Sequence, residues 1–163
     1  MKALVFSDSH GKSSNIKNAI ELHKSNTDAV IFLGDGIKDI ERIKDSYPQI
    51  AFFIVKGNCD FMAQGYENEK IITIGTKRVL LCHGHTLSVK STLIRATMRA
   101  IELECDALFY GHTHIPDDNI CEIMDKRIQT FNPGSIGYQG SYGIVNTSGN
   151  VLVTSHTRID QNM

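Results

Sequence analysis

The first third of the chain alternates short apolar runs with amphipathic segments, and this alternation is the strongest constraint on the fold. Continuous apolar runs at residues 2–6, 29–33 and 50–55 predict buried strands, each ending in a polar loop that contains glycine. Strand, loop and helix in that order, repeated, are typical of a parallel sheet wrapped by helices. The intervening helices are predicted from apolar residues at helical spacing, with Ser13 or Ser14 as the first N-cap: Ile16, Ala19 and Ile20, then Ile37, Ile40 and Ile43.

The second half predicts mostly antiparallel pairing. Strands at 71–74 and 79–82 flank a hairpin turn at Gly75-Thr76. A helix is expected from Ser91 or a neighbour to about Glu104, followed by a strand at 107–110 and hairpins at 120–131 and 142–155. The apolar side of that helix is predicted to carry Leu93, Ile94, Thr97, Met98 and Ile101. Together the two halves indicate an α/β protein with two packed sheets and helices outside, forming one domain over residues 1–163.

Length and charge limit the classes of function. A chain of 163 residues is long enough for one well-packed core. Its formal net charge of −1 offers no basic surface for a long nucleic acid, although small phosphorylated substrates need only local positive charge. No stretch approaches the roughly 20 apolar residues of a membrane span. The four cysteines lack Cys-x-x-Cys spacing, which favours reduced thiols, and we expect a cytoplasmic protein.

Histidines and acidic residues gather directly after the predicted strands. A single aspartate at a strand end is usually a turn former, but turns have no need of so many imidazoles. The residues concerned are His10, His83, His85, His112 and His114, with Asp8, Asp35, Asn58 and Asp60. Mixed imidazole and carboxylate donors suit Mn, Fe, Zn, Ni or Co.

The pair His112-Thr113-His114 leaves two alternatives open. In an extended chain, residues i and i+2 point to the same face, about 6–7 Å apart. The two rings are therefore able to hold one ion together, or two ions about 3.5–4 Å apart.

Five ordered motifs between Lys2 and Ser135 resemble the calcineurin-like metallophosphoesterase superfamily, and within it the small phosphodiesterases of the YfcE type. The motifs are Asp8-x-His10, Gly34-Asp35, Gly57-Asn58-x-Asp60, His83-Gly84-His85 and Gly111-His112-x-His114. The resemblance implies a four-layer αββα sandwich of two mixed sheets flanked by helices. It also implies two divalent ions, most often Mn, with a bridging hydroxide that attacks phosphorus.

The resemblance also implies a division of ligands between the two ions. One ion would be held by Asp8, His10 and His114, and the other by Asn58, His83 and His112. Asp35 would bridge them. The implied activity is hydrolysis of small phosphodiesters, and self-association into a dimer or tetramer is expected from the same resemblance.

Cys59 departs from the wider superfamily, where a histidine often follows the asparagine and assists at the leaving group. A thiol has a reference pKa of about 8.5 and carries no positive charge at pH 7. We therefore expect a preference for phosphodiesters with good leaving groups. His85 is either a partial substitute for that histidine or a structural residue, and Arg95 and Arg99 form either a solvated face or a substrate clamp.

Two other functions compete with the phosphodiesterase. A phosphomonoesterase or phosphoprotein phosphatase would use the same metal core. An interaction scaffold would resemble the retromer subunit that shares this fold but has an eroded ligand set. All seven predicted ligand positions here hold competent donors, which favours an enzyme.

Overall fold

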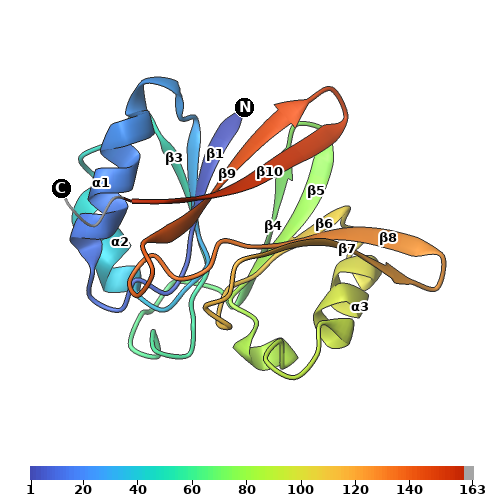
Figure 1. Cartoon of the computed structure of the whole chain (residues 1–163). Helices are drawn as coiled ribbons and strands as arrows, with labels where there is room; N and C mark the ends of the chain where they lie inside the picture. Colours follow the sequence, from blue (N-terminus) through green and yellow to red (C-terminus); the bar gives the residue numbers. More distant parts are fainter. Residues whose placement is uncertain (160–163) are drawn as a thin grey trace.

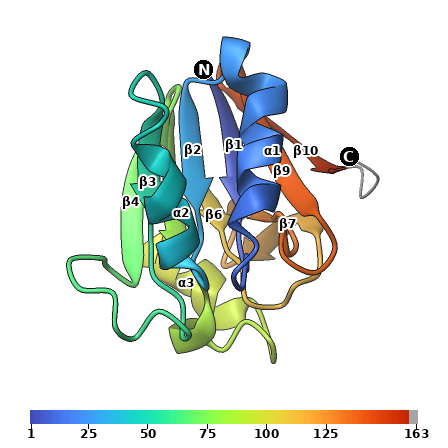
Figure 2. The same cartoon turned by 90° about the vertical axis from the view of Figure 1, so that its left-hand side faces the viewer.

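The computed structural model describes residues 1–159 and forms two five-stranded sheets packed face to face, with helices on both outer faces (Figures 1 and 2). The first sheet has the order β10-β9-β1-β2-β3 and the second β4-β5-β6-β8-β7. Helices α1 (Ser13–His23) and α2 (Ile37–Lys44) cover the first sheet, and α3 (Ile94–Glu102) covers the second. The predicted αββα sandwich of mixed sheets is confirmed.

The first sheet is parallel on one side and antiparallel on the other. Strands β1 (Lys2–Phe6), β2 (Ala29–Phe32) and β3 (Ala51–Ile54) run parallel. Their carboxyl ends therefore lie at the same end of the sheet. The antiparallel hairpin of β9 (Ser141–Ser148) and β10 (Val151–Arg158) extends the sheet beside β1.

The second sheet has a parallel centre and antiparallel edge strands. Strands β5 (Lys77–Cys82), β6 (Ala107–Phe109) and β8 (Lys126–Asn132) are parallel. Strands β4 (Glu69–Ile74) and β7 (Asp117–Ile123) pair antiparallel at the two edges. The expected hairpins are present, and β8 additionally pairs parallel with β6. The loops after β5 and β6 consequently leave from one edge as well.

The alternation of side chains along β1 separates the layers. Leu4 and Phe6 point toward α1 and α2, whereas Ala3 and Val5 point toward the second sheet. Because both faces are covered, β1 and β2 need apolar residues at every position, which explains their continuous apolar runs. A third cluster fills the space under α3 and includes Leu80 and Leu108.

Two helix predictions are wrong in detail. The serines do not cap α1: the helix begins at Ser13 after Lys12, with no side-chain cap, because hydrogen-bonded turns (Lys12 N to Ser9 O, 2.9 Å) lead into it. Helix α3 begins at Ile94 rather than near Ser91, since Ser88 O instead accepts N–H groups in a turn.

The buried face of α3 agrees with the prediction in part, because Thr97 is buried and Leu93 and Ile101 pack against the third cluster. Ala96, Thr97 and Ala100 are buried, while Ile94 and Met98 are 58% and 43% exposed. Small side chains allow the helix to lie close to the second sheet, and this close packing outweighs the larger apolar residues. No helix between residues 1 and 159 is long and apolar enough to cross a membrane.

His23 lies at the end of α1 in contact with the first sheet. Its Nε2 atom is 3.0 Å from the Tyr142 hydroxyl, and its Nδ1 atom is 3.3 Å from Lys2 Nζ. Burial lowers the pKa of His23 below its ordinary value of 6.5, and the charge of Lys2 acts in the same direction. The fold thus favours the neutral ring.

The pH dependence of stability tests this environment. Below pH 6.5 the unfolded chain takes up the proton before the folded chain does, so the free energy of unfolding should fall as the pH drops from about 7.5 to 5. His23→Gln keeps a polar group but does not titrate, and urea unfolding should show a flatter pH dependence for this variant. Parallel profiles for the two proteins would contradict the assignment.

Candidate metal centre

Loops from both sheets meet at the end of the sandwich where the parallel strands terminate. The loop after β1 is hydrogen-bonded to the loop after β2, through Asp8 N to Gly34 O at 2.9 Å. The loops after β5 and β6 are joined by Gly111 N to His83 O at 3.2 Å. Gly34 approaches the loop after β3 so closely that a Cβ atom there would lie 2.5 Å from Gly57 N. Backbone contact therefore holds the predicted ligand loops together.

The first group of donors comprises Asp8, His10 and His114, whose ligand atoms all lie within 4.8 Å of one another. His114 Nε2 is 3.0 Å from Asp8 Oδ1 and 3.4 Å from His10 Nε2. His10 Nε2 is 3.7 Å from the same Asp8 oxygen. These three residues are the predicted ligands of one ion.

The second group comprises Asp35, His83 and His112, again within 4.8 Å of one another. His83 Nε2 lies 3.4 Å from Asp35 Oδ2 and 3.9 Å from Asp8 Oδ1, so the two groups adjoin. Asp35 also forms a donor group with His10 and Cys59. It therefore borders both groups, which is the position that a bridging carboxylate requires.

Asn58 reaches the site through its neighbour. Its side-chain amide donates to Cys59 Sγ at 3.4 Å, and the Cys59 N–H donates to Asp35 Oδ1 at 2.8 Å. The structure thus brings six of the seven predicted ligands into two adjoining donor groups and sets Asn58 beside them.

Two atoms of predicted ligands are buried with no hydrogen-bond partner among residues 1–159: Asp8 Oδ1 and His83 Nε2. The contact of Asp8 Oδ1 with His114 Nε2 is short but lacks hydrogen-bond geometry. The second polar atom of each side chain does have partners. Asp8 Oδ2 accepts hydrogen bonds from Ser7 Oγ and His112 N, and His83 Nδ1 lies 2.7 Å from Leu33 O. A buried polar atom without a partner costs about 1–3 kcal/mol, and a cation would satisfy both. The donors therefore fit a metal ion.

The charges of the site favour the ligand forms of Asp35 and His112 and oppose that of His83. Burial alone would raise the pKa of Asp35, but the contact and charge of His83 and the Cys59 N–H outweigh it and hold that pKa well below its usual range. Burial and the charge of His83 lower the pKa of His112 to about 4, so its ring is neutral at pH 7. Burial opposes protonation of His83, but contact with Asp35 and the charge of Asp8 raise its pKa. A proton on His83 therefore offsets part of the negative charge of Asp8 and Asp35, and a bound cation would offset the same charge.

The backbone is strained at most of the predicted ligands. Among residues 1–159, nine non-glycine residues have positive φ, and five of these are Asp8, His10, Asp35, His112 and His114, with φ between 44° and 68°. This left-handed region costs a non-glycine residue on the order of 1 kcal/mol and clusters at functional sites. Sequence reasoning does not detect this feature.

Asp60 organises the site, a role that the sequence did not reveal although its position after a strand was noted. Its Oδ1 atom accepts the N–H groups of Gly36 and Ile37 at 3.0 and 2.9 Å, and its Oδ2 atom accepts those of Asp35 and Gly57 at 2.7 and 2.9 Å. One carboxylate thus caps α2 from a different loop and joins the loops after β2 and β3. A signal existed in the last position of Gly57-Asn58-x-Asp60, because aspartate commonly accepts backbone N–H groups at helix starts.

The turn at residues 132–135 supports the other loops. The buried Asn132 amide donates to Gly111 O and Thr113 Oγ, both at 3.0 Å, and Ser135 Oγ donates to Asp8 O at 2.8 Å. This turn lies against the loops that carry the predicted ligands. His156 Nε2 in turn lies 2.7 Å from Asn132 O.

Three residues with alternative roles differ in their surroundings. His85 lies beside His83 and His112, with ring centroids 5.5 and 6.3 Å away, and its Nδ1 atom is buried without a partner among the described residues. Arg99 binds Glu69 Oε2 at 2.9 Å, and Arg95 lies 3.3 Å from Ser88 Oγ. Neither arginine contacts the donor groups through these bonds, which favours a solvated face over a substrate clamp.

Comparisons with known proteins agree on one family. A family model described as the calcineurin-like phosphoesterase superfamily domain matches residues 1–150. The probable metallophosphoesterase YsnB of Bacillus subtilis (strain 168) is 34% identical over 137 residues, 83% of this chain and 75% of that protein. The phosphodiesterase YfcE of Escherichia coli (strain K12) is 27% identical over 175 residues, 89% of this chain and 87% of that protein. The structure of vacuolar protein sorting 29 from Cryptosporidium parvum, with a TM-score of 0.76 at 19% identity over 99% of this chain and 93% of that one, shares the fold.

Asp60→Asn tests the organising carboxylate. The amide keeps the shape but presents NH2 to two of the four backbone N–H groups, so the free energy of unfolding should fall by about 2–4 kcal/mol in urea titrations. Affinity for Mn²⁺, measured by calorimetry, should fall as well because the ligand loops lose their link. Asp45→Asn, an exposed acidic residue at the other end of α2, serves as the control and should change stability by less than about 0.5 kcal/mol. Equal effects of the two variants would refute the role.

Proposed function

The chain belongs to the calcineurin-like phosphoesterase superfamily, and on that premise we propose that it is a phosphodiesterase that uses two divalent metal ions, preferably Mn²⁺. The observation that carries the proposal is the pair of adjoining donor groups around two unpartnered buried atoms, Asp8 Oδ1 and His83 Nε2. The name of the E. coli relative, a phosphodiesterase, supports the same activity.

The proposed ligands divide between the two ions. Asp8, His10 and His114 hold one ion, Asn58, His83 and His112 hold the other, and Asp35 serves both. Two such ions would neutralise the charge of the phosphate and activate a water molecule for attack on phosphorus. The neutral ring of His112 and the ionised carboxylate of Asp35 are the protonation states that ligation requires.

Cys59 supports a restriction on the leaving group. Burial, followed by contact with Asp35, raises the pKa of the Cys59 thiol to about 11, so this side chain is neutral at pH 7. It supplies no positive charge and is a weaker acid toward a departing alkoxide than a protonated histidine. The proposed substrates are therefore small phosphodiesters that have good leaving groups, rather than long nucleic acids, which the net charge of −1 disfavours.

Two alternatives keep the same fold. A phosphomonoesterase or phosphoprotein phosphatase would use the same donor groups. A scaffold protein is the alternative from a different class, and the likeness to vacuolar protein sorting 29 concerns the fold alone. The filled donor positions support an enzyme over a scaffold, and the neutral Cys59 supports the diesterase over the monoesterase.

Hydrolysis of matched chromogenic substrates tests this function. With Mn²⁺ added, kcat/KM for bis(4-nitrophenyl) phosphate should exceed that for 4-nitrophenyl phosphate by at least about tenfold, or 1.4 kcal/mol. Alkyl diesters should react much more slowly than aryl diesters, and Cys59→His should narrow that gap. A purified protein that retains no metal and hydrolyses neither substrate would overturn the enzyme proposals, and similar turnover of alkyl and aryl diesters would overturn the leaving-group argument.

Variants of the His112-Thr113-His114 pair test the division of ligands. His112→Ala and His114→Ala should each lower the metal content from about two ions to about one, and the remaining ion should differ between them. Metal analysis gives the number, and electron paramagnetic resonance of the Mn²⁺ form should lose the spin coupling of a pair in both variants. Loss of the same single ion in both variants would show that the histidines share one ion.

A further inference from the structure

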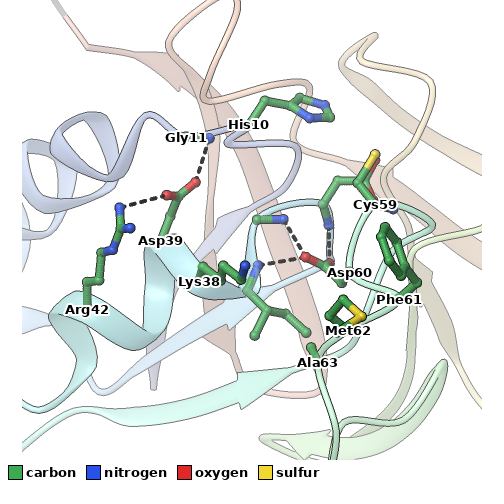
Figure 3. A pocket seen from close by; sticks show the side chains of 13 residues that line it. His10, Gly11, Lys38, Asp39, Arg42, Cys59, Asp60, Phe61, Met62 and Ala63 are labelled. Carbon is green, nitrogen blue, oxygen red and sulfur yellow. Dashed lines mark hydrogen bonds and ion pairs between the residues drawn. The ribbon is translucent and has the colours of Figure 1, made fainter.

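A pocket of about 340 Å³ opens beside the metal donors and has two chemically different walls (Figure 3). His10, Asp35 and Cys59 form its end at the candidate metal centre. Phe61 and Met62 stand on one side, and Asp39 and Arg42 on the other. A group attached to a phosphate at the metal centre would enter this pocket directly.

The apolar wall contains large side chains that the core does not use. Phe61 is 80% exposed and Met62 71% exposed, whereas Ile37, which also lines the pocket, is buried. The segment is held in place, because Ala63 N donates to Asp60 O at 2.9 Å directly after the organising carboxylate. Exposed apolar side chains gathered at a held position beside a site commonly bind a ligand.

The opposite wall carries positive charge. Lys38 and Arg42 are one turn apart on α2, both are exposed, and both line the pocket. Asp39 lies between them, but its buried carboxylate already accepts hydrogen bonds from Ser9 Oγ at 2.6 Å and Gly11 N at 2.8 Å, and lies 3.9 Å from Arg42. This wall thus carries two positive charges and one negative charge, so its net charge is positive.

We propose that this pocket binds one ester group of the substrate, and that this group is an aromatic ring bearing a second anionic substituent, a carboxylate or a phosphate. The proposal rests on the phosphodiesterase function and specifies its substrate class. The ring packs against Phe61 and Met62, and the second anion lies toward Lys38 and Arg42, while the phosphate that is cleaved stays at the metal donors. A simple alkyl group would leave both walls unused.

Non-hydrolysable phosphonates test the pocket because each carries a single organic group. Methylphosphonate, phenylphosphonate, 4-carboxyphenylphosphonate and 1,4-phenylenediphosphonate should be titrated into the Mn²⁺-loaded protein by calorimetry and assayed as inhibitors of diester hydrolysis. We expect phenylphosphonate to bind about tenfold more tightly than methylphosphonate. A para anion should add about threefold to tenfold more, and this gain should shrink at high salt. Comparing the carboxylate with the second phosphonate identifies the preferred anion.

Variants assign each preference to a wall. Phe61→Ala should reduce the phenyl preference to about twofold, and Lys38→Ala combined with Arg42→Ala should remove the gain from the para anion. Met124→Ala and Lys126→Ala change exposed residues of the β7–β8 hairpin and should leave every affinity unchanged.

The outcomes separate this proposal from the function on which it rests. A protein that retains Mn²⁺ and hydrolyses diesters, but binds methyl- and phenylphosphonate equally, would overturn only the proposal that the pocket binds an aromatic ester group. That proposal is also overturned if the Phe61→Ala variant keeps the preference for phenylphosphonate over methylphosphonate. Absence of both metal and hydrolysis would overturn the phosphodiesterase proposal itself.

Discussion

The parallel pairing of strands in both sheets is the constraint on which the rest of the structure depends. Because β1, β2 and β3 run in one direction, and β5, β6 and β8 also share a direction, the loops that follow them meet along one edge. Residues more than a hundred positions apart, such as Asp8 and His114, are thereby brought to 3.0 Å. The chemistry of the site follows from this topology, since each loop contributes only one or two donors.

Backbone strain and unpartnered buried atoms at the candidate site oppose folding, and hydrogen bonds between its loops offset that cost. Five predicted ligands have left-handed backbones, and two buried ligand atoms, Asp8 Oδ1 and His83 Nε2, lack partners among the described residues. The carboxylate of Asp60, with four N–H groups, and the buried Asn132 amide hold the loops against that strain. A preorganised set of donors results, in which the unfavourable contacts are those that a cation would relieve.

Sequence patterns predicted the features that depend on burial and failed where the outcome depends on contacts between loops. Strands buried on both faces need unbroken apolar runs, so β1 and β2 were identifiable, and the polar loops after them pointed to the candidate ligands. The cap of α1 and the inward positions of Ile94 and Met98 on α3 were mispredicted, because a turn at Lys12 and close packing through Ala96 replaced the usual signals. The role of Asp60 and the pocket beside Phe61 depend on hydrogen bonds and proximity between different loops, which no local pattern records.

The position of Asp60 in the chain has a consequence for how proteins built on this scaffold diversify. Its carboxylate joins the start of α2, which carries Lys38 and Arg42, to the segment that begins with Phe61 and Met62. Asn58 and Cys59, directly before this junction, are hydrogen-bonded to each other, and the Cys59 N–H donates to Asp35, whereas Phe61 and Met62, directly after it, are exposed. These two exposed positions are therefore free to accept substitutions that alter which molecules are bound while the candidate metal centre stays intact. Selection is thereby able to act on specificity and on chemistry separately.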